Sequence, residues 1–347
     1  MEQQVKNITY PYKRKPKNNT FKEIAPRVYW LRLGMPFSLD HINLWLIEED
    51  NYWTLVDTGP NTSTSKTAWQ EIFSTQLQNK PIKQIICTHS HPDHVGLAGW
   101  ICENQSAKLL ISKGEFEFYH QIFANNKPTS IAQAQTFYQQ AGASDDQIKS
   151  YFKHIKIFSN LISLMPSSYQ QLQHNDGITL GKYQWQVHIG RGHSPEHICL
   201  FCEELNLFIS GDQLLPTISS NISVWPTQPN ANPMADFFLS CQDISKVINN
   251  QTLVLPSHGL PFYGGENRLN TLSEDAKQDM ACLYDFCLQP RTVSETFPIL
   301  FKANIDENNL MLAFGEALAS LNYLCAQGRI IATPDENGIK YYQQTGA

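Results

Sequence analysis

The segment CTHSHPDHVG, residues 87–96, decides how this sequence is interpreted, because it places three imidazoles and one carboxylate within six positions. These side chains belong to His89, His91, Asp93 and His94. The apolar run IKQIICTH (82–89) predicts a buried strand, and Pro92 is tolerated in the first turn of a helix. The cluster therefore lies where a strand ends and a helix begins.

The spacing of these residues predicts two partial metal sites. His89 and His91 are two positions apart in extended chain, so both side chains leave the same face and can bind one ion. Asp93 and His94 follow the proline bend and point in another direction, where they can serve a second ion. Zinc takes about four ligands in proteins, so each site needs further ligands from elsewhere in the chain.

Three later segments offer those ligands at strand ends, beside glycine or other small residues. They are GRGHSPEH with His193, FISGDQL with Asp212 and LPSHGLP with His258. The expected assignment gives His89, His91 and His193 to one ion, Asp93, His94 and His258 to the other, and Asp212 to both as a bridge. His197 begins the next strand and is expected to form hydrogen bonds instead.

The rest of the chain mixes strands with helices. Strands are predicted at 28–33, 42–49, 52–59, 82–89, 183–190, 198–204, 207–212 and 252–259. Helices are predicted at 62–79, from Pro92 to about Gln105, and at 234–250. With candidate ligands at strand ends, this pattern indicates a layered α/β (α+β) architecture.

Three segments stand apart from this central domain, which we assign to residues 21–265. Residues 1–20 form a polar leader. Residues 113–175 are interpreted as an insertion of three helices whose aromatic residues form its core, with an apolar substrate channel as the alternative. Residues 266–347 contain helices followed by a hairpin that turns at DENG, which is typical of a winged helix-turn-helix.

Composition limits the partners of this protein of 347 residues with net charge −6. No run approaches the roughly 18 apolar residues of a membrane span, and eight cysteines without a paired framework favour a reducing cytoplasm. Residues 266–347 carry six Lys or Arg against eleven Asp or Glu, a balance of −5 that makes nucleic acid an unfavourable partner. The tail is therefore expected to pack on the catalytic domain or to pair two subunits as a homodimer.

The chain resembles the metallo-β-lactamase fold superfamily over about residues 20–265. The resemblance rests on the HxHxDH string at 89–94 and on His, Asp and His following in order at strand ends. It implies an αββα sandwich with two metal ions in a cleft at one edge of the packed sheets, here followed by the small winged-helix domain. It also implies that Asp57, in LVDTG, has a supporting role beside the metal loops.

The ligand set favours two zinc ions, with iron or manganese as alternatives, because it has nitrogen and oxygen donors without thiolate. Relatives that use two irons for redox work typically carry Glu in place of His91, which favours hydrolysis here. Two cations would lower the pKa of a water molecule between them, and the resulting hydroxide would attack the substrate. Asp93 is the expected catalytic residue, orienting that water or accepting its proton.

The substrate stays open between several classes. A small ester or thioester is favoured, because the site is similar to that of glyoxalase II, although the basic glutathione-binding tail of that enzyme is absent. Lactamase-like endoribonucleases share the order of parts but conflict with the acidic tail, and lactonases present Tyr where this chain has Leu215. A DNA-binding metal sensor is the non-enzymatic alternative. Arg191 is a candidate contact for an anionic substrate group.

Overall fold

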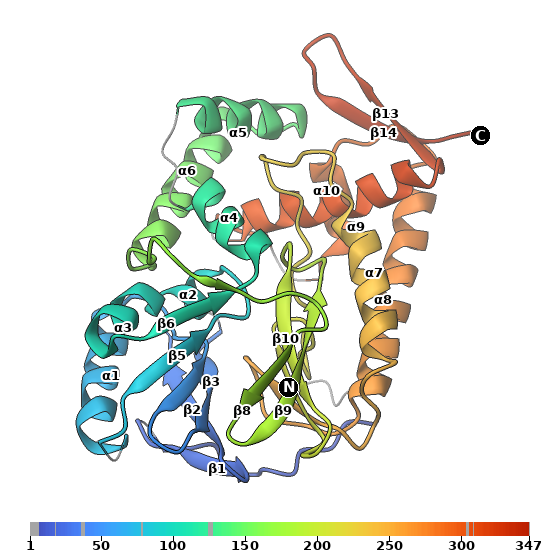
Figure 1. Ribbon diagram of the computed structural model, residues 1–347. Helices are drawn as coiled ribbons and strands as arrows, with labels where there is room; N and C mark the ends of the chain where they lie inside the picture. The colour runs from blue at the N-terminus through green and yellow to red at the C-terminus, as the bar shows by residue number, and fades with distance from the viewer. Residues whose placement is uncertain are drawn as a thin grey trace.

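The computed structural model describes residues 7–17, 19–35, 39–77, 79–123, 128–302, 305–307 and 309–346, and its centre is a pair of packed sheets (Figure 1). The first sheet contains, in spatial order, β1 (Lys22–Ala25), β2 (Val28–Gly34), β3 (His41–Glu48), β4 (Trp53–Val56), β5 (Ile82–Ile86), β6 (Lys108–Ile111) and β7 (Gln170–Gln171). The second contains β12 (Leu253–Pro256), β11 (Leu207–Gly211), β10 (His197–Cys202), β9 (Tyr183–Gly190) and β8 (Gly177–Leu180).

The two sheets are joined by apolar side chains that alternate along their strands. On β10, Ile198 and Leu200 face the first sheet, where they meet Trp30 and Trp45, whose rings stack at 6.2 Å. Cys199, between them in sequence, belongs to the cluster on the outer face of the second sheet. This period of two is what a strand buried on both faces requires.

Helices cover the outer face of each sheet, which confirms the predicted αββα sandwich. Residues of α1 (Ser63–Thr75), α3 (Ala98–Gln105) and α4 (Lys113–Ile122) pack on the first sheet. Residues of α7 (Pro233–Ile244) and α8 (Gly265–Phe286) pack on the second (Figure 1). Every predicted strand is present with ends shifted by a few residues, whereas β1, β6, β7 and β8 were not among the predictions.

The helix predicted from Pro92 to Gln105 is wrong in one respect, because it is divided. α2 (Pro92–Val95) is followed by Gly96, and the chain turns before α3 begins at Ala98. A Cβ at Gly96 would lie 2.3 Å from the Pro92 carbonyl oxygen and 2.6 Å from those of Gly59 and Leu161. Three backbone segments therefore meet at this glycine, and its tight packing fixes the direction of the short helix α2.

The insertion contains the three predicted helices, α4, α5 (Pro128–Gln140) and α6 (Asp145–Asn160); residues 124–127 between them lie outside the described part of the chain. The C-terminal segment contains α8, the single turn η1 (Ser294–Thr296), α9 (Phe297–Leu300), α10 (Leu310–Ala326) and the antiparallel hairpin β13 (Ile330–Pro334) with β14 (Lys340–Gln344). The helices and the hairpin occur in the predicted order. The winged-helix interpretation and the domain boundaries stay predictions.

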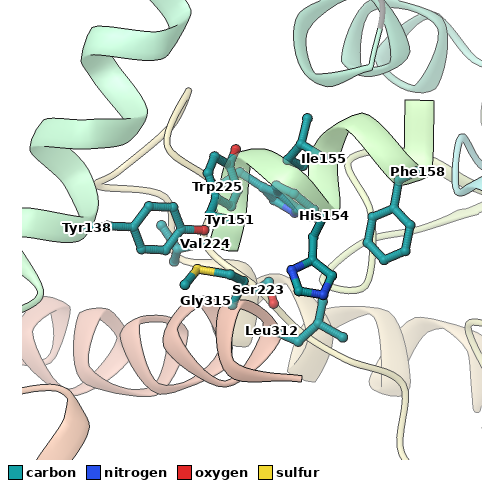
Figure 2. A pocket seen from close by; sticks show the side chains of 11 residues that line it. Tyr138, Tyr151, His154, Ile155, Phe158, Ser223, Val224, Trp225, Leu312 and Gly315 are labelled. Carbon is teal, nitrogen blue, oxygen red and sulfur yellow. The ribbon is translucent and has the colours of Figure 1, made fainter. Parts of the chain in front are cut away.

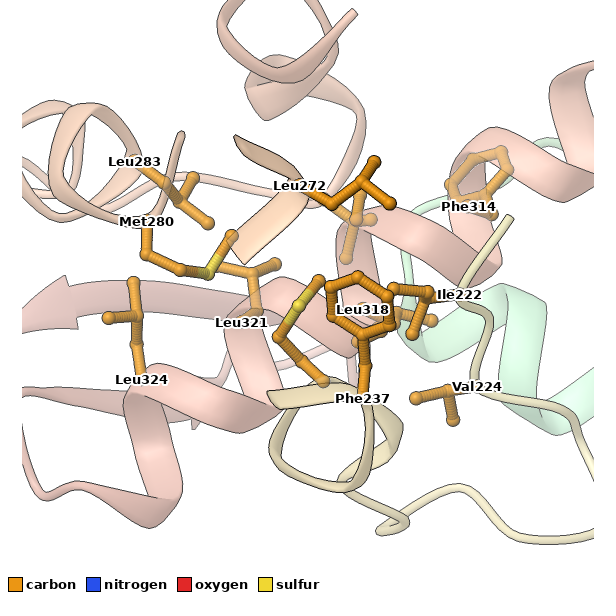
Figure 3. Close-up of a cluster of buried hydrophobic side chains, with 14 of the residues drawn as sticks. Ile222, Val224, Phe237, Leu272, Met280, Leu283, Phe314, Leu318, Leu321 and Leu324 are labelled. Atoms are coloured by element: carbon orange, nitrogen blue, oxygen red, sulfur yellow. The ribbon is translucent and has the colours of Figure 1, made fainter. Parts of the chain in front are cut away.

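One apolar cluster joins the C-terminal segment to the second sheet and to the insertion. Phe314 and Leu318 of α10 pack with Phe237 of α7 and Leu272 of α8 (Figure 3). Tyr138 of α5 belongs to the same cluster, with its ring 6.0 Å from that of Phe314. Of the two expected roles of the tail, the structure shows the packing on the catalytic domain, and the pairing of two subunits stays a prediction. Among the described residues, no helix combines the length and apolar character needed to span a membrane.

Candidate metal centre

All seven predicted ligands meet at one edge of the sandwich, where the carboxyl ends of strands from both sheets converge. His89 and His91 follow β5, and α2 carries Asp93 and His94. The remaining three are His193 after β9, Asp212 after β11 and His258 after β12. Their donor atoms form three groups within 4.8 Å: His89, His91 and His193; Asp93, His94 and His258; and Asp212 with His89 and His94.

The first group consists of three imidazoles whose ring nitrogens face one another. His89 Nε2 lies 2.9 Å from His91 Nδ1 and 3.2 Å from His193 Nε2. In a tetrahedral zinc site with Zn–N bonds of ~2.0–2.1 Å, ligand nitrogens are about 3.3–3.4 Å apart. The 3.2 Å separation is close to this value and the 2.9 Å separation is shorter, so the three nitrogens are near enough to share one cation.

The second group brings Asp93 Oδ2 to 3.3 Å from His258 Nε2 and to 3.5 Å from His94 Nε2. Asp212 lies between the groups. Its Oδ1 is 3.5 Å from His258 Nε2, and its Oδ2 is 3.5 Å from His94 Nε2 and 3.7 Å from His193 Nε2. One carboxylate thus faces both groups, which is the geometry expected of a bridging ligand.

Hydrogen bonds on the far side of three rings fix their tautomers. The Nδ1–H groups donate over 2.8 Å: His94 to Asp57 Oδ2, His193 to the Asn221 carbonyl and His258 to the His41 carbonyl. Nε2 is then left as a lone-pair donor aimed into the cluster. His94 Nε2, His258 Nε2 and Asp212 Oδ1 are buried without a hydrogen-bond partner in the described structure. Such atoms are costly unless a cation binds them, so the residues fit a metal site.

Electrostatics divide the histidines into two sets. Burial lowers the pKa of His89 far below its usual value and that of His91 to about 3. Burial also acts against the charged form of His258, but Asp212 and Asp93 outweigh it and raise the pKa to about 10. Burial also lowers the pKa of His193, so all three imidazoles of the first group favour the neutral form that metal binding requires. In the second group, the negative carboxylates favour a positive charge beside them. In the metal-free protein protons on the histidines supply that charge, and a bound cation would replace them.

Asp57 lies where the resemblance implied, beneath the metal loops. It has φ of 60° and accepts hydrogen bonds from the Thr88 backbone N–H at 2.8 Å and from the Thr88 hydroxyl. With His94 as its third partner, it connects the turn after β4 to the turn after β5 and to α2. His197 is fully buried, and its Nε2 accepts the Asp212 backbone N–H at 3.1 Å, the hydrogen-bonding role expected of it.

Sequence reasoning missed Glu115, a fully buried carboxylate at the start of α4. It accepts hydrogen bonds from the backbone and hydroxyl of Ser90, at 3.0 and 2.8 Å, and from the Glu196 backbone at 2.8 Å. It therefore ties the loop of His89 to the loop of His193. Its position could have indicated this role, because it follows β6 closely. β6 is parallel to β5, so both strands end at the edge of the sheet where the proposed ligands lie.

Two pockets share Ser223 and Trp225 in their linings, and one of them reaches the metal centre. The entrance pocket reaches His193 and is also lined by Phe118, Arg191, Gln228 and Asp236. Arg191 pairs with Glu196 at 3.3 Å on its rim. The apolar pocket lies between the insertion and α10, lined by Tyr138, Tyr151, His154, Phe158, Met311 and Leu312 (Figure 2). Tyr138 and Tyr151 belong to the buried core, as expected, and also line this pocket; an apolar substrate channel stays a prediction.

Comparison with known proteins gives matches to both parts of the chain. The family model described as the metallo-beta-lactamase superfamily matches residues 38–237, and one described as the metallo-beta-lactamase-like C-terminal domain matches residues 280–345. The probable metallo-hydrolase YqjP of Bacillus subtilis is 26% identical over 335 residues, covering 90% of this chain and 96% of the relative. An (R)-specific secondary-alkylsulfatase from Pseudomonas is 31% identical over 86 residues, 25% of this chain and 12% of that protein.

Solved structures extend the likeness over almost the whole fold. A beta-lactamase domain protein from Burkholderia ambifaria has a TM-score of 0.88 at 34% identity, covering 97% of this chain and 98% of that one. A metallo-beta-lactamase family protein from Thermus thermophilus has a TM-score of 0.80 at 22% identity, covering 93% and 100%. The chain therefore belongs to the metallo-beta-lactamase superfamily and is a metal-dependent hydrolase.

Proposed function

We propose that the chain is a dinuclear zinc-dependent hydrolase that cleaves an ester or thioester of a small-molecule substrate. The observation that carries this proposal is the pair of donor groups with Asp212 between them, three of whose buried atoms lack a partner in the described structure. Two cations at this spacing would lower the pKa of a water molecule and polarise the substrate's carbonyl oxygen. Histidine and carboxylate donors without thiolate favour zinc, with iron or manganese as alternatives.

Asp93 is the proposed catalytic residue. Its Oδ2 faces His94 and His258, so its second oxygen is left to orient the attacking water or accept its proton. Its side chain is 21% exposed, against 11% for Asp212, and it is the carboxylate nearer to solvent and to incoming substrate. In the entrance pocket, Arg191 is the proposed contact for an anionic substrate group, which would compete with Glu196 for the guanidinium.

A sulfate ester with an alkyl chain is the second candidate substrate. The apolar pocket favours it, because an alkyl chain seated there would extend past Trp225 toward His193. One partial relative carries the name of a secondary-alkylsulfatase. We also propose a cytoplasmic location, supported by eight cysteines that are all free.

The deciding experiment compares three probes on zinc-loaded protein: S-lactoylglutathione, a p-nitrophenyl alkyl ester and a secondary alkyl sulfate. His91→Ala serves as the blank. If the protein is an esterase or thioesterase, we expect zinc-dependent hydrolysis of one of the first two probes, with kcat/KM above ~10⁴ M⁻¹s⁻¹. Turnover of the sulfate alone would replace it with the second candidate. Asp93→Ala is expected to lose metal and rate together, and unchanged zinc content and turnover would remove Asp93 from its assigned role.

A further inference from the structure

Helix α10, in the C-terminal segment, contacts the loop that forms a hydrogen bond with the proposed metal ligand His193. This loop follows Asp212 and ends where α7 begins at Pro233. Its Val224 N–H donates to the Gly315 carbonyl of α10 at 3.0 Å. Ile222 and Val224 are buried in the cluster that contains Phe314 (Figure 3). The loop is therefore held by the backbone and by apolar side chains of α10.

Asn221, in the same loop, connects α10 to the metal centre by two hydrogen bonds. Its side-chain Nδ2 donates to Glu316 Oε2 at 2.7 Å, and its backbone carbonyl accepts the His193 Nδ1–H at 2.8 Å. Ser223 donates its hydroxyl proton to the remaining side-chain oxygen of Asn221. The residue is thus fixed on both sides, and its carbonyl is aimed at the imidazole that faces His89.

Glu316 is a costly residue to keep on this helix. Burial raises the pKa of its carboxyl group to about 7, and Asn221 supplies the side-chain hydrogen bond that partly opposes this rise. Among the described residues, no Lys or Arg forms an ion pair with it. An apolar residue would serve packing alone better than an acid at this half-buried position. Among the described residues, the hydrogen bond recorded for this carboxyl group is the one from Asn221.

We propose that Glu316 is a positioning residue for His193, acting through Asn221, so that the C-terminal segment contributes directly to metal affinity. The inference rests on the proposed role of His193 as a ligand. Hydrogen-bond partners that hold a metal-bound histidine typically change metal affinity by about 10- to 100-fold when they are removed. Glu316 is one contact further out, so we expect the lower end of that range.

The test measures zinc affinity by competition with a chelator, together with the visible absorption bands of Co²⁺-loaded protein, which report ligand geometry. Glu316→Leu removes the acceptor and is expected to weaken one of the two zinc sites by about 10-fold with altered cobalt bands. Glu316→Gln keeps an acceptor oxygen and is expected to stay within about threefold of the wild-type protein.

A charge swap tests the same contact without removing it. Asn221→Asp alone sets two carboxyl groups against each other and is expected to weaken zinc binding. Combining it with Glu316→Gln restores a donor opposite an acceptor, and affinity should return. This pair also serves if Glu316→Leu fails to fold. The matched control is Asn322→Ala, which removes hydrogen bonds from α10 to the Pro229 and Ala231 carbonyls, at 3.1 and 2.9 Å, without touching Asn221.

His193→Ala separates this inference from the proposed site. If His193→Ala loses one zinc ion while Glu316→Leu and Asn221→Asp bind zinc like Asn322→Ala, then Glu316 does not position the ligand. If the charge swap fails to restore affinity lost in Asn221→Asp, the contact between the two side chains is not the cause. If His193→Ala itself keeps two tightly bound zinc ions, the metal assignment fails.

Discussion

The buried carboxylate of Asp57 determines which nitrogen of the proposed ligand His94 is free to bind a metal ion, although Asp57 is not itself a proposed ligand. It accepts the His94 Nδ1–H and thereby leaves Nε2 as a lone-pair donor. Asp57→Asn can turn its amide N–H₂ toward the ring, which would favour the other tautomer. We expect zinc affinity to fall by about 10- to 100-fold, measured by chelator competition. Wild-type affinity in a folded Asp57→Asn protein would contradict this role.

Glu316 predicts a specific pH dependence of stability. Burial, with a smaller contribution from Asp279 and opposed by Asn221, raises its pKa from 4.5 to about 7. A raised carboxyl pKa means that the folded state prefers the protonated form. The contribution of Glu316 to the free energy of unfolding is therefore fully present below pH 4.5. This contribution falls by about 3 kcal/mol as the pH rises from there through about 7. Glu316→Gln should lack this loss.

The measurement is urea unfolding of both proteins at about pH 5 and about pH 8, with a chelator present so that metal binding does not contribute. The wild-type unfolding free energy should fall relative to that of Glu316→Gln as the pH rises. Equal changes in the two proteins would show that Glu316 titrates as it does in the unfolded chain.

At the residue scale, the sequence was most informative where chemistry needs particular side chains. The seven proposed ligands, whose donor atoms lie close together in the structure, could be named from the sequence because their types and their places at strand ends are specific. Asn221 and His41 could not be found this way, because they act through backbone carbonyls that any residue supplies. Glu316 is 95 positions from Asn221 and contacts it only because α10 packs beneath the loop.

At the scale of elements, Gly96 governs how α2 presents Asp93 and His94. Gly96→Ala would push a methyl group against three backbone carbonyl oxygens that cannot move independently. We expect a loss of about 1–3 kcal/mol in urea unfolding together with weaker zinc binding, because α2 must shift. Gly177→Ala is the matched control, since a Cβ there meets nothing within 4 Å. Equal stability of the two variants would refute the close approach at Gly96.

The elements that sequence analysis missed have physical reasons. β7 is two residues long and owes its pairing to β6, so no local pattern marks it. β1 has no fully buried side chain, which leaves it without clear alternation. The division between α2 and α3 depends on contacts of Gly96 with segments distant in sequence. Long amphipathic or apolar segments such as α8 and α10 were recognised, because their periodicity is local.

For the whole molecule, the important feature is one apolar cluster shared by segments that look separate in sequence. α10 buries Phe314, Leu318 and Leu321 against the rest of the same chain. This intramolecular packing accounts for the apolar character of α10, and the homodimer stays a prediction. Composition changes after about residue 266, but the core is continuous there, so we expect cooperative unfolding.

Phe314→Ala tests this continuity, because all seven tryptophans lie between residues 30 and 225, outside the C-terminal segment. Removing this fully buried ring leaves a cavity beside Phe297 and Tyr138 and should cost about 3–5 kcal/mol. The urea midpoint followed by tryptophan fluorescence should therefore fall, although the substitution is far from most of those indoles in sequence. Leu288→Ala, at a side chain 52% exposed, should leave it unchanged. In the contrary case, Phe314→Ala would leave the fluorescence midpoint unchanged, while far-ultraviolet circular dichroism would detect a loss of helix at lower urea. That result would show that the C-terminal segment unfolds independently.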